Sequence, residues 1–359
     1  MKYITEYRDN KQVQELSALI HKVSKKPLVI MEVCGSHTMA IHRFGIQSLL
    51  PENIMLISGP GCPVCVTAID YMDKAIFLAK MPNTIITTFG DLIKVPGSAS
   101  SLEKEKAKGA DIRMVYSILE SIEIAQSNPD KNVVFLAIGF ETTTPPTAAG
   151  IIKASEIGLN NFSILSAHKI MPPPMQAIID EGIQVDAFLA PGHVSVITGT
   201  DMYGFISEKY NKGVVVSGFE PLDVLQSVYM LVKQQNENKA KVEIQYSRVV
   251  KAEGNPKARA AVDEVFEITS SNWRGLGIIP DSALKVRSKY AKFDAEKVFD
   301  INIENSKEPA GCICGQVLKG LNKPSDCKLF GKVCTPENPT GACMVSSEGA
   351  CNVFYRYQN

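Results

Sequence analysis

The sequence has no excess of charge of either sign, since Lys plus Arg and Asp plus Glu both number 38 among 359 residues. A protein that binds nucleic acid through counterion release normally carries a basic excess, so we expect no nucleic-acid partner. No apolar run approaches the roughly 18 residues of a membrane-spanning helix. The charged opening segment MKYITEYRDNKQVQELSALI also lacks the apolar core of a signal peptide. We therefore expect no membrane partner and a cytoplasmic location.

Cysteine is absent from a long central stretch, residues 66–311, although the chain has nine cysteines. Cys34, Cys62 and Cys65 come before this stretch, and the other six lie between residues 312 and 351. Thiols in the cytosol are kept reduced, so metal binding or catalysis explains such grouping better than structural disulfides do. The cysteines are therefore the first candidates for the functional site.

Short apolar runs alternate with longer amphipathic stretches, which predicts an α/β fold with parallel sheets. The runs cover residues 28–33, 54–58, 84–88, 133–138, 163–167, 187–190 and 214–217, and amphipathic stretches cover 66–80, 112–126 and 222–232. We expect two doubly wound α/β domains, at residues 1–125 and 126–236, with one larger sheet as the alternative. A polar break at 233–241 separates them from a C-terminal domain at 237–359, which begins with a strand-like piece and a helix and ends in the Cys-rich segment.

Cys34 directly follows the first apolar run, and the carboxyl ends of parallel strands are where α/β sheets place their chemistry. Amide groups at the start of the next helix favour its thiolate. His37 lies three residues on and can meet the sulfur on one helical face. The pair is typical of a soft metal site or of a thiolate–imidazolium pair. A buried cysteine beside a capping histidine is the alternative.

Cys62 and Cys65 form a Cys-x-x-Cys motif within GPGCPVC, between a strand and a helix. This position is typical of a redox dithiol, in which the first thiol attacks and the second resolves. The alternatives are two unreactive cysteines, or half of a zinc site whose second Cys-x-x-Cys motif is missing. The glycines form neither a G-x-G-x-x-G nor a P-loop motif, so there is no nucleotide fingerprint.

Other polar residues also follow predicted strands. Glu141, in GFETTTP, either works as an acid or base, orients a ligand, or simply belongs to a well-capped helix start. His193, in PGH, is interpreted as structural, as a single histidine usually is. Asp91 and His168 carry no stronger signal.

The late cysteines are typical of an iron–sulfur cluster, because four thiolates hold a [4Fe–4S] cluster. They are Cys312, Cys314, Cys327, Cys334, Cys343 and Cys351. Structural zinc usually uses close Cys-x-x-Cys pairs, which this segment lacks. In an extended segment Cys312 and Cys314 point opposite ways, so we expect only one of them to be a ligand. Spacing alone does not say which four bind, and the two spare thiols can pass electrons into disulfides.

Together these motifs resemble the HypD family of [NiFe]-hydrogenase maturation factors over essentially the whole chain. The motifs are CGSHT at 34–38, GPGCPVC at 59–65, GFETTTP at 139–145, PGH at 191–193, CICGQVL at 312–318, CKLFGKVCTP at 327–336 and CMVSSEGAC at 343–351. The resemblance implies two Rossmann-like domains plus a small Cys-rich iron–sulfur domain. It also implies the cluster ligands, whose spacers of 14, 6 and 16 residues match the family: Cys312, Cys327, Cys334 and Cys351.

The same resemblance implies roles for the remaining thiols. Cys34 is similar to the family's iron-binding cysteine, with His37 in the same site, and Cys314 and Cys343 match a pair proposed to exchange a disulfide with Cys62 and Cys65. The implied function is a scaffold and redox component on which an iron carrying CN and CO ligands, Fe(CN)2CO, is assembled. The implied partners are a HypC-type chaperone, a HypE-type cyanide donor and, through the chaperone, the hydrogenase large-subunit precursor.

Two other functions compete with this interpretation. One is a free-standing iron–sulfur protein-disulfide reductase, which would use the cluster and Cys62–Cys65 on diffusible partners. The other is a nucleotide-binding α/β enzyme whose tail is a structural metal site. The Cys34-x-x-His37 pair distinguishes the iron scaffold from the reductase, because an iron scaffold needs the pair and a plain dithiol reductase does not.

Overall fold

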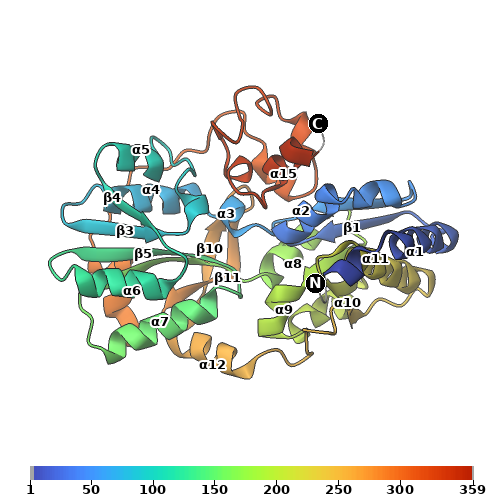
Figure 1. The fold of residues 1–359 in the computed structure, drawn as a ribbon, viewed down its shortest axis with the longest axis horizontal. Coiled ribbons are helices and arrows are strands. Elements are labelled where there is room, and N and C mark those ends of the chain that lie inside the picture. Colours follow the sequence, from blue (N-terminus) through green and yellow to red (C-terminus); the bar gives the residue numbers. More distant parts are fainter. Residues whose placement is uncertain (1–3, 358–359) are drawn as a thin grey trace.

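The computed structural model describes residues 4–357, which form two α/β lobes with a Cys-rich segment above the junction between them (Figure 1). The first sheet has five parallel strands in the order β2-β1-β7-β8-β9, and the second has four in the order β4-β3-β5-β6. The strands of the first sheet are β1 (Leu28–Glu32), β2 (Ile54–Ser58), β7 (Ala187–Pro191), β8 (Gly213–Ser217) and β9 (Val242–Ile244). Those of the second are β3 (Thr84–Thr88), β4 (Asp111–Met114), β5 (Asn132–Gly139) and β6 (Phe162–His168).

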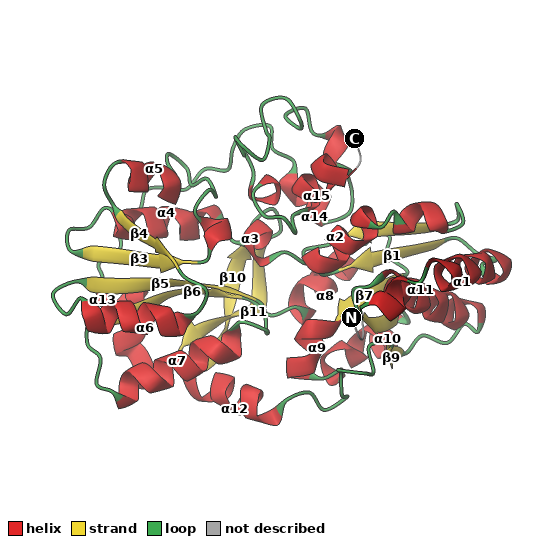
Figure 2. Cartoon of the chain, viewed as in Figure 1, coloured by secondary structure: helices red, strands yellow, loops and turns green. Residues whose placement is uncertain are grey.

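Helices cover the sheets of both lobes (Figure 2). Helices of the first lobe are α1 (Asn10–Val23), α2 (Gly35–Arg43), α9 (Gly192–Thr198), α10 (Gly204–Tyr210) and α11 (Pro221–Asn236). Helices of the second are α4 (Ile69–Ala79), α5 (Leu102–Ala107), α6 (Ile118–Ser127), α7 (Thr144–Glu156), α12 (Pro256–Val265) and α13 (Ala295–Val298). The short α3 (Pro63–Val66) and α8 (Pro172–Asp180) lie on the two connections between the sheets. Short 3-10 helices are Thr5–Arg8, Ile46–Leu49, Gly90–Leu92, Asp201–Tyr203, Ser288–Phe293, Pro324–Asp326 and Ala342–Met344.

The α/β fold with parallel sheets is confirmed, and each of the seven predicted apolar runs forms a strand. Strands β3, β7 and β8 are buried along their whole length, as strands of a parallel sheet covered on both faces must be. Strand β4 was not predicted, because residues 112–126 were expected to form one amphipathic helix. It is a sheet edge with a half-buried pattern, and helix α6 starts only after Ser117, whose side chain accepts from Glu120 N.

The lobes do not follow the expected boundaries at residues 125 and 236. The chain builds β1 and β2 of the first sheet, crosses to the other lobe for β3 to β6, and returns for β7 to β9. The segment 126–236 therefore contributes to both sheets, and β9 lies beyond residue 236. Each apolar run was recognisable by itself, but strand partners are chosen by long-range packing that local composition does not encode.

The rest of the chain joins the lobes. An antiparallel hairpin, β10 (Phe266–Trp273) and β11 (Gly277–Val286), packs on the second lobe through β6. The Cys-rich segment follows and is mostly loop (Figure 2). It holds the short helices α14 (Cys314–Leu318) and α15 (Ala350–Tyr357) and the last two 3-10 helices. Among residues 4–357, no helix is both long enough and apolar enough to cross a membrane.

Candidate functional site

Three loops meet at the carboxyl edge of the first sheet, because β1 lies between β2 and β7 and all three strands are parallel. The loop after β1 carries Cys34, the loop after β2 carries Cys62 and Cys65, and β7 is followed by His193. Gly35 N donates to Gly61 O at 3.1 Å, so the loops after β1 and β2 touch. The topology thus brings the early cysteines together, as strand-end chemistry predicts.

Cys34 caps the start of α2 and is buried, with 3% of its surface exposed. Its pKa is raised, first by burial and second by the Glu348 carboxylate, while the backbone amides of His37 and Ser36 act in the opposite direction. The expected helix-start effect is therefore present, but burial outweighs it. In the metal-free protein the thiol is protonated, so binding a metal there must displace a proton.

The imidazole at the sulfur is not the one expected. His193 Nδ1 lies 4.0 Å from Cys34 Sγ, whereas the His37 ring places Nε2 2.9 Å from Gly218 O. His37 Nδ1 is buried without a hydrogen-bond partner, and the ring stacks on Phe219 at a centroid distance of 4.7 Å. Burial lowers the pKa of both histidines to about 4, so both rings are neutral. His193 was interpreted from the sequence as structural, and its place beside Cys34 was missed. The PGH motif at the end of a strand could have indicated that place.

Two carboxylates complete the surroundings of Cys34, and neither was predicted. Glu32 is 1% exposed and accepts from Cys34 N at 3.1 Å and from Thr38 Oγ1 at 2.5 Å. Burial raises the pKa of Glu32 to about 8, so this carboxyl is mostly protonated at neutral pH. Glu348 reaches the site from the Cys-rich segment and accepts from Ser36 Oγ at 2.5 Å. Glu32 was missed because it lies inside an apolar run. Glu348 was missed because only the tertiary fold brings it near Cys34.

The dithiol touches the Cys-rich segment. Cys62 and Cys65 are 3% and 0% exposed, and Cys65 N donates to Cys62 Sγ at 3.3 Å. The pKa of Cys65 is raised well above its usual range, mainly by burial. Helix α3 packs against the 3-10 helix Ala342–Met344, and Cys343 lies near enough to Cys65 to act on its pKa, as Cys314 and Cys351 act on that of Cys343. Cys343 therefore links the dithiol to the late cysteines.

Five of the six late cysteines surround a small cavity. Its cysteine lining is Cys312, Cys314, Cys327, Cys334 and Cys351. The expectation that Cys312 and Cys314 point in opposite directions is wrong, since their sulfurs lie 3.0 Å apart. Ile313 has φ −105° and ψ 25° at the start of α14, and this turn, unlike an extended strand, brings both side chains to one side.

Glu141 follows β5 of the second lobe. Its Oε1 accepts from Met171 N at 2.8 Å, and its Oε2 is buried without a partner. Burial raises the pKa of Glu141 to about 7, a value suited to proton transfer at neutral pH. Asp91 holds the Cys-rich segment by accepting from Ser346 Oγ at 2.9 Å, and His168 is fully buried with both ring nitrogens unpartnered.

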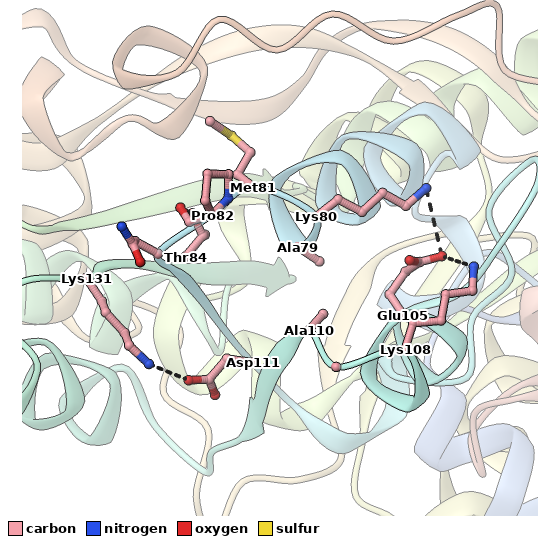
Figure 3. Close-up of a pocket in the computed structure, with 12 residues that line it drawn as sticks. Ala79, Lys80, Met81, Pro82, Thr84, Glu105, Lys108, Ala110, Asp111 and Lys131 are labelled. Atoms are coloured by element: carbon pink, nitrogen blue, oxygen red, sulfur yellow. Dashed lines mark hydrogen bonds and ion pairs between the residues drawn. The ribbon is translucent and has the colours of Figure 1, made fainter.

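A separate hollow lies at the opposite, amino edge of the second sheet (Figure 3). Its charged groups neutralise one another, since Lys131 pairs with Asp111, and Lys80 and Lys108 pair with Glu105. No predicted site residue lines it. Among the described residues, no three His, Cys, Asp or Glu side chains converge on a single metal ion.

The fold and the site define a two-lobed α/β protein whose candidate functional groups are mostly buried thiols. A family model described as HypD, hydrogenase formation hypA family, matches residues 11–358. A hydrogenase maturation factor HypD from Rhizobium leguminosarum is 50% identical, with 99% of this chain and 96% of that protein covered. HypD2 of Bradyrhizobium diazoefficiens is 49% identical over 99% and 97%, and a putative hydrogenase expression/formation protein of Methanocaldococcus jannaschii is 47% identical over 97% and 96%.

These similarities extend over nearly the whole length of each chain. The protein belongs to the HypD family of hydrogenase maturation factors.

Proposed function

We propose that this maturation factor is the scaffold and redox component on which the Fe(CN)2CO group is assembled. The observation that carries the proposal is the continuous set of thiols between Cys34 and the cysteine-lined cavity. The loop of Cys34 touches the loop of the dithiol, and the dithiol helix α3 packs against the segment of Cys343, which lies beside cysteines of the cavity. The proposed iron anchor and the thiols that would supply electrons are thus neighbours within one molecule.

The iron is the substrate of this assembly, and Cys34 is its proposed anchor. A thiolate suits a soft low-spin iron with carbonyl and cyanide ligands. His193 offers a neutral imidazole nitrogen 4.0 Å from the sulfur, while His37 holds the loop through Gly218. One or two protein donors leave positions for the diatomic ligands and for a donor from a HypC-type chaperone.

The lining of the cavity suits a [4Fe–4S] cluster, because the four proposed ligands Cys312, Cys327, Cys334 and Cys351 are all part of it. The Cys312 and Cys314 sulfurs are in contact, too close together to bind two different irons of one cluster. Only one of them is then a ligand, and Cys314 remains a thiol beside Cys343. When bound, such a cluster supplies single electrons.

The proposed reduction balances with the thiols present. Cleaving the S–CN bond of a thiocyanate-like carrier on a HypE-type partner consumes two electrons and one proton, and releases a thiol and cyanide. Oxidising Cys62 and Cys65 to a disulfide releases two electrons and two protons. The Cys314–Cys343 pair could then reduce that disulfide by thiol–disulfide exchange, since the segment of Cys343 packs against the helix of Cys65.

The location and the remaining partner follow the same chemistry. All nine cysteines are free thiols in the structure, which supports a reducing, cytoplasmic compartment. The finished group would pass through the chaperone to the hydrogenase large-subunit precursor. A free-standing disulfide reductase is less well supported, because it would need neither Cys34 nor the His193 imidazole nitrogen 4.0 Å from the Cys34 sulfur.

Infrared spectroscopy of the anaerobically isolated complex with the chaperone tests the proposal. We expect cyanide and carbonyl stretching bands in the wild-type complex. Cys34→Ala should lose both bands while keeping its fold and the absorption of the tail cluster. The proposal fails if the fully loaded wild-type complex lacks the bands, or if Cys34→Ala shows them at wild-type intensity.

A further inference from the structure

Arg274 has a buried guanidinium group with no hydrogen-bond partner. The residue is 3% exposed, and its Nε, Nη1 and Nη2 atoms are all buried and unpartnered. The ion pair given for it joins Nε to Glu308 Oε1 at 3.5 Å, and the Glu308 side chain is 50% exposed. Burying a charge is costly when its only counter-charge is one half-exposed carboxylate and its N–H groups lack acceptors, so this arrangement favours a further anion.

The position of Arg274 shows where that anion would lie. Arg274 N donates to Val66 O at 2.9 Å, next to the dithiol cysteine Cys65. On its other side, Gly275 packs so closely on Gly315 that a methyl group on Gly275 would lie 2.2 Å from Gly315 Cα. In Figure 1, β10 ends beside α3, beneath the C-terminal segment. Arg274 therefore stands between the dithiol helix and the first cysteines of the cavity.

The charge of Arg274 is felt at Cys312, one of the proposed ligands, and among the described residues no lysine, arginine or carboxylate side chain lines the cavity itself. Four thiolates on a dicationic [4Fe–4S] core leave a dianion.

We propose that Arg274 is the counter-charge of the cluster, a positioning residue that stabilises its anionic ligand set and favours its reduced state. This inference rests on the proposed cluster. Reduction adds one negative charge to the dianion, so a buried cation beside it favours the electron-rich form. Without that cation, the ratio of reduced to oxidised cluster at a fixed potential should fall about tenfold, a decrease in midpoint potential of about 59 mV for one electron.

The test compares Arg274→Gln, Arg274→Lys and Glu308→Gln with the wild type, all purified anaerobically as full chains. Iron and sulfide content, circular dichroism and an EPR-monitored redox titration are measured for each. We expect Arg274→Gln to fold and either to lower the midpoint potential as stated or to lose cluster that Arg274→Lys retains. Arg274→Lys should stay closer to the wild-type potential, and Glu308→Gln should keep it.

Other outcomes overturn the inference. A fully loaded Arg274→Gln protein with the wild-type potential shows that the charge does not act on the cluster. If Arg274→Lys loses the fold or the cluster together with Arg274→Gln, or if Glu308→Gln reproduces Arg274→Gln, the residue has only a structural role. A wild-type chain without iron–sulfur absorption would instead remove the proposed cluster, before any variant is compared.

Discussion

Adding one methyl group at Gly61 should displace Cys34 from its place in the site. A methyl group on Gly61 would lie 2.1 Å from Cys34 N and 2.4 Å from both Cys34 Cα and the carbonyl carbon of Val33. These are backbone atoms, so no side-chain rotation relieves the overlap. The loop after β2 or the loop after β1 has to move.

The size of the effect follows from the cost of overpacking. Inserting a methyl group into a packed interior typically costs about 1–3 kcal/mol. Since three backbone atoms are involved, we expect Gly61→Ala to lower the free energy of unfolding by about 3 kcal/mol, a large part of a typical total of about 5–15 kcal/mol. The loop shift should also remove the infrared bands of the iron group.

Urea unfolding can be followed through Trp273, which is the only tryptophan and is fully buried. Gly204→Ala is the matched control, because a methyl group there meets only Glu208 Oε1, at 3.6 Å. The control should stay within about 0.5 kcal/mol of the wild type. A Gly61→Ala protein as stable as this control would show that the loops do not meet as described.

Three further results are expected. Cys351→Ala should abolish the iron–sulfur absorption and Cys343→Ala should retain it, because Cys351 lines the cavity and Cys343 does not; equal loss in both variants would contradict the ligand assignment. Because the pKa of Glu141 is raised from 4.5 to about 7 in the folded protein, its neutral form favours folding below pH about 4.5, and this advantage is lost as the pH rises to about 7. Measured by urea unfolding, the free energy of unfolding of the wild type relative to Glu141→Gln should fall by about 3 kcal/mol across that pH interval. A difference that does not change with pH would refute the burial argument. In mass-spectrometric alkylation of the folded, reduced protein, Cys62 should react slowly but before the fully buried Cys65, whereas rates like those of an unfolded chain would contradict their burial.

The local features of the chain were predictable because they depend on short stretches. Each of the seven apolar runs forms a strand, and Cys34 and Cys62 each stand at the start of a helix as predicted. Strand β4 escaped prediction because an edge strand with polar Asp111 and Arg113 has no continuous apolar run. The turn at Ile313 was also missed, and with it the contact between two cysteine sulfurs.

Long-range neighbours were not predictable from local patterns. His193 and Cys34 are far apart in sequence, and they meet because β7 pairs with β1. Glu348 reaches the same site because the Cys-rich segment folds back over the junction between the lobes. Arg274 belongs to no motif, and only the burial of its guanidinium group without a hydrogen-bond partner indicates a role.

The sequence by itself determined the α/β class, the grouping of the cysteines and, through its motifs, the family. Those properties depend on residue type and short spacing. The tertiary structure alone decided which strands share a sheet, that segment 126–236 is divided between both lobes, and that Cys343 joins the dithiol to the cavity. Burial also reversed the expected ionisation of Cys34, because desolvation depends on everything packed around the sulfur and not on its neighbours in the chain.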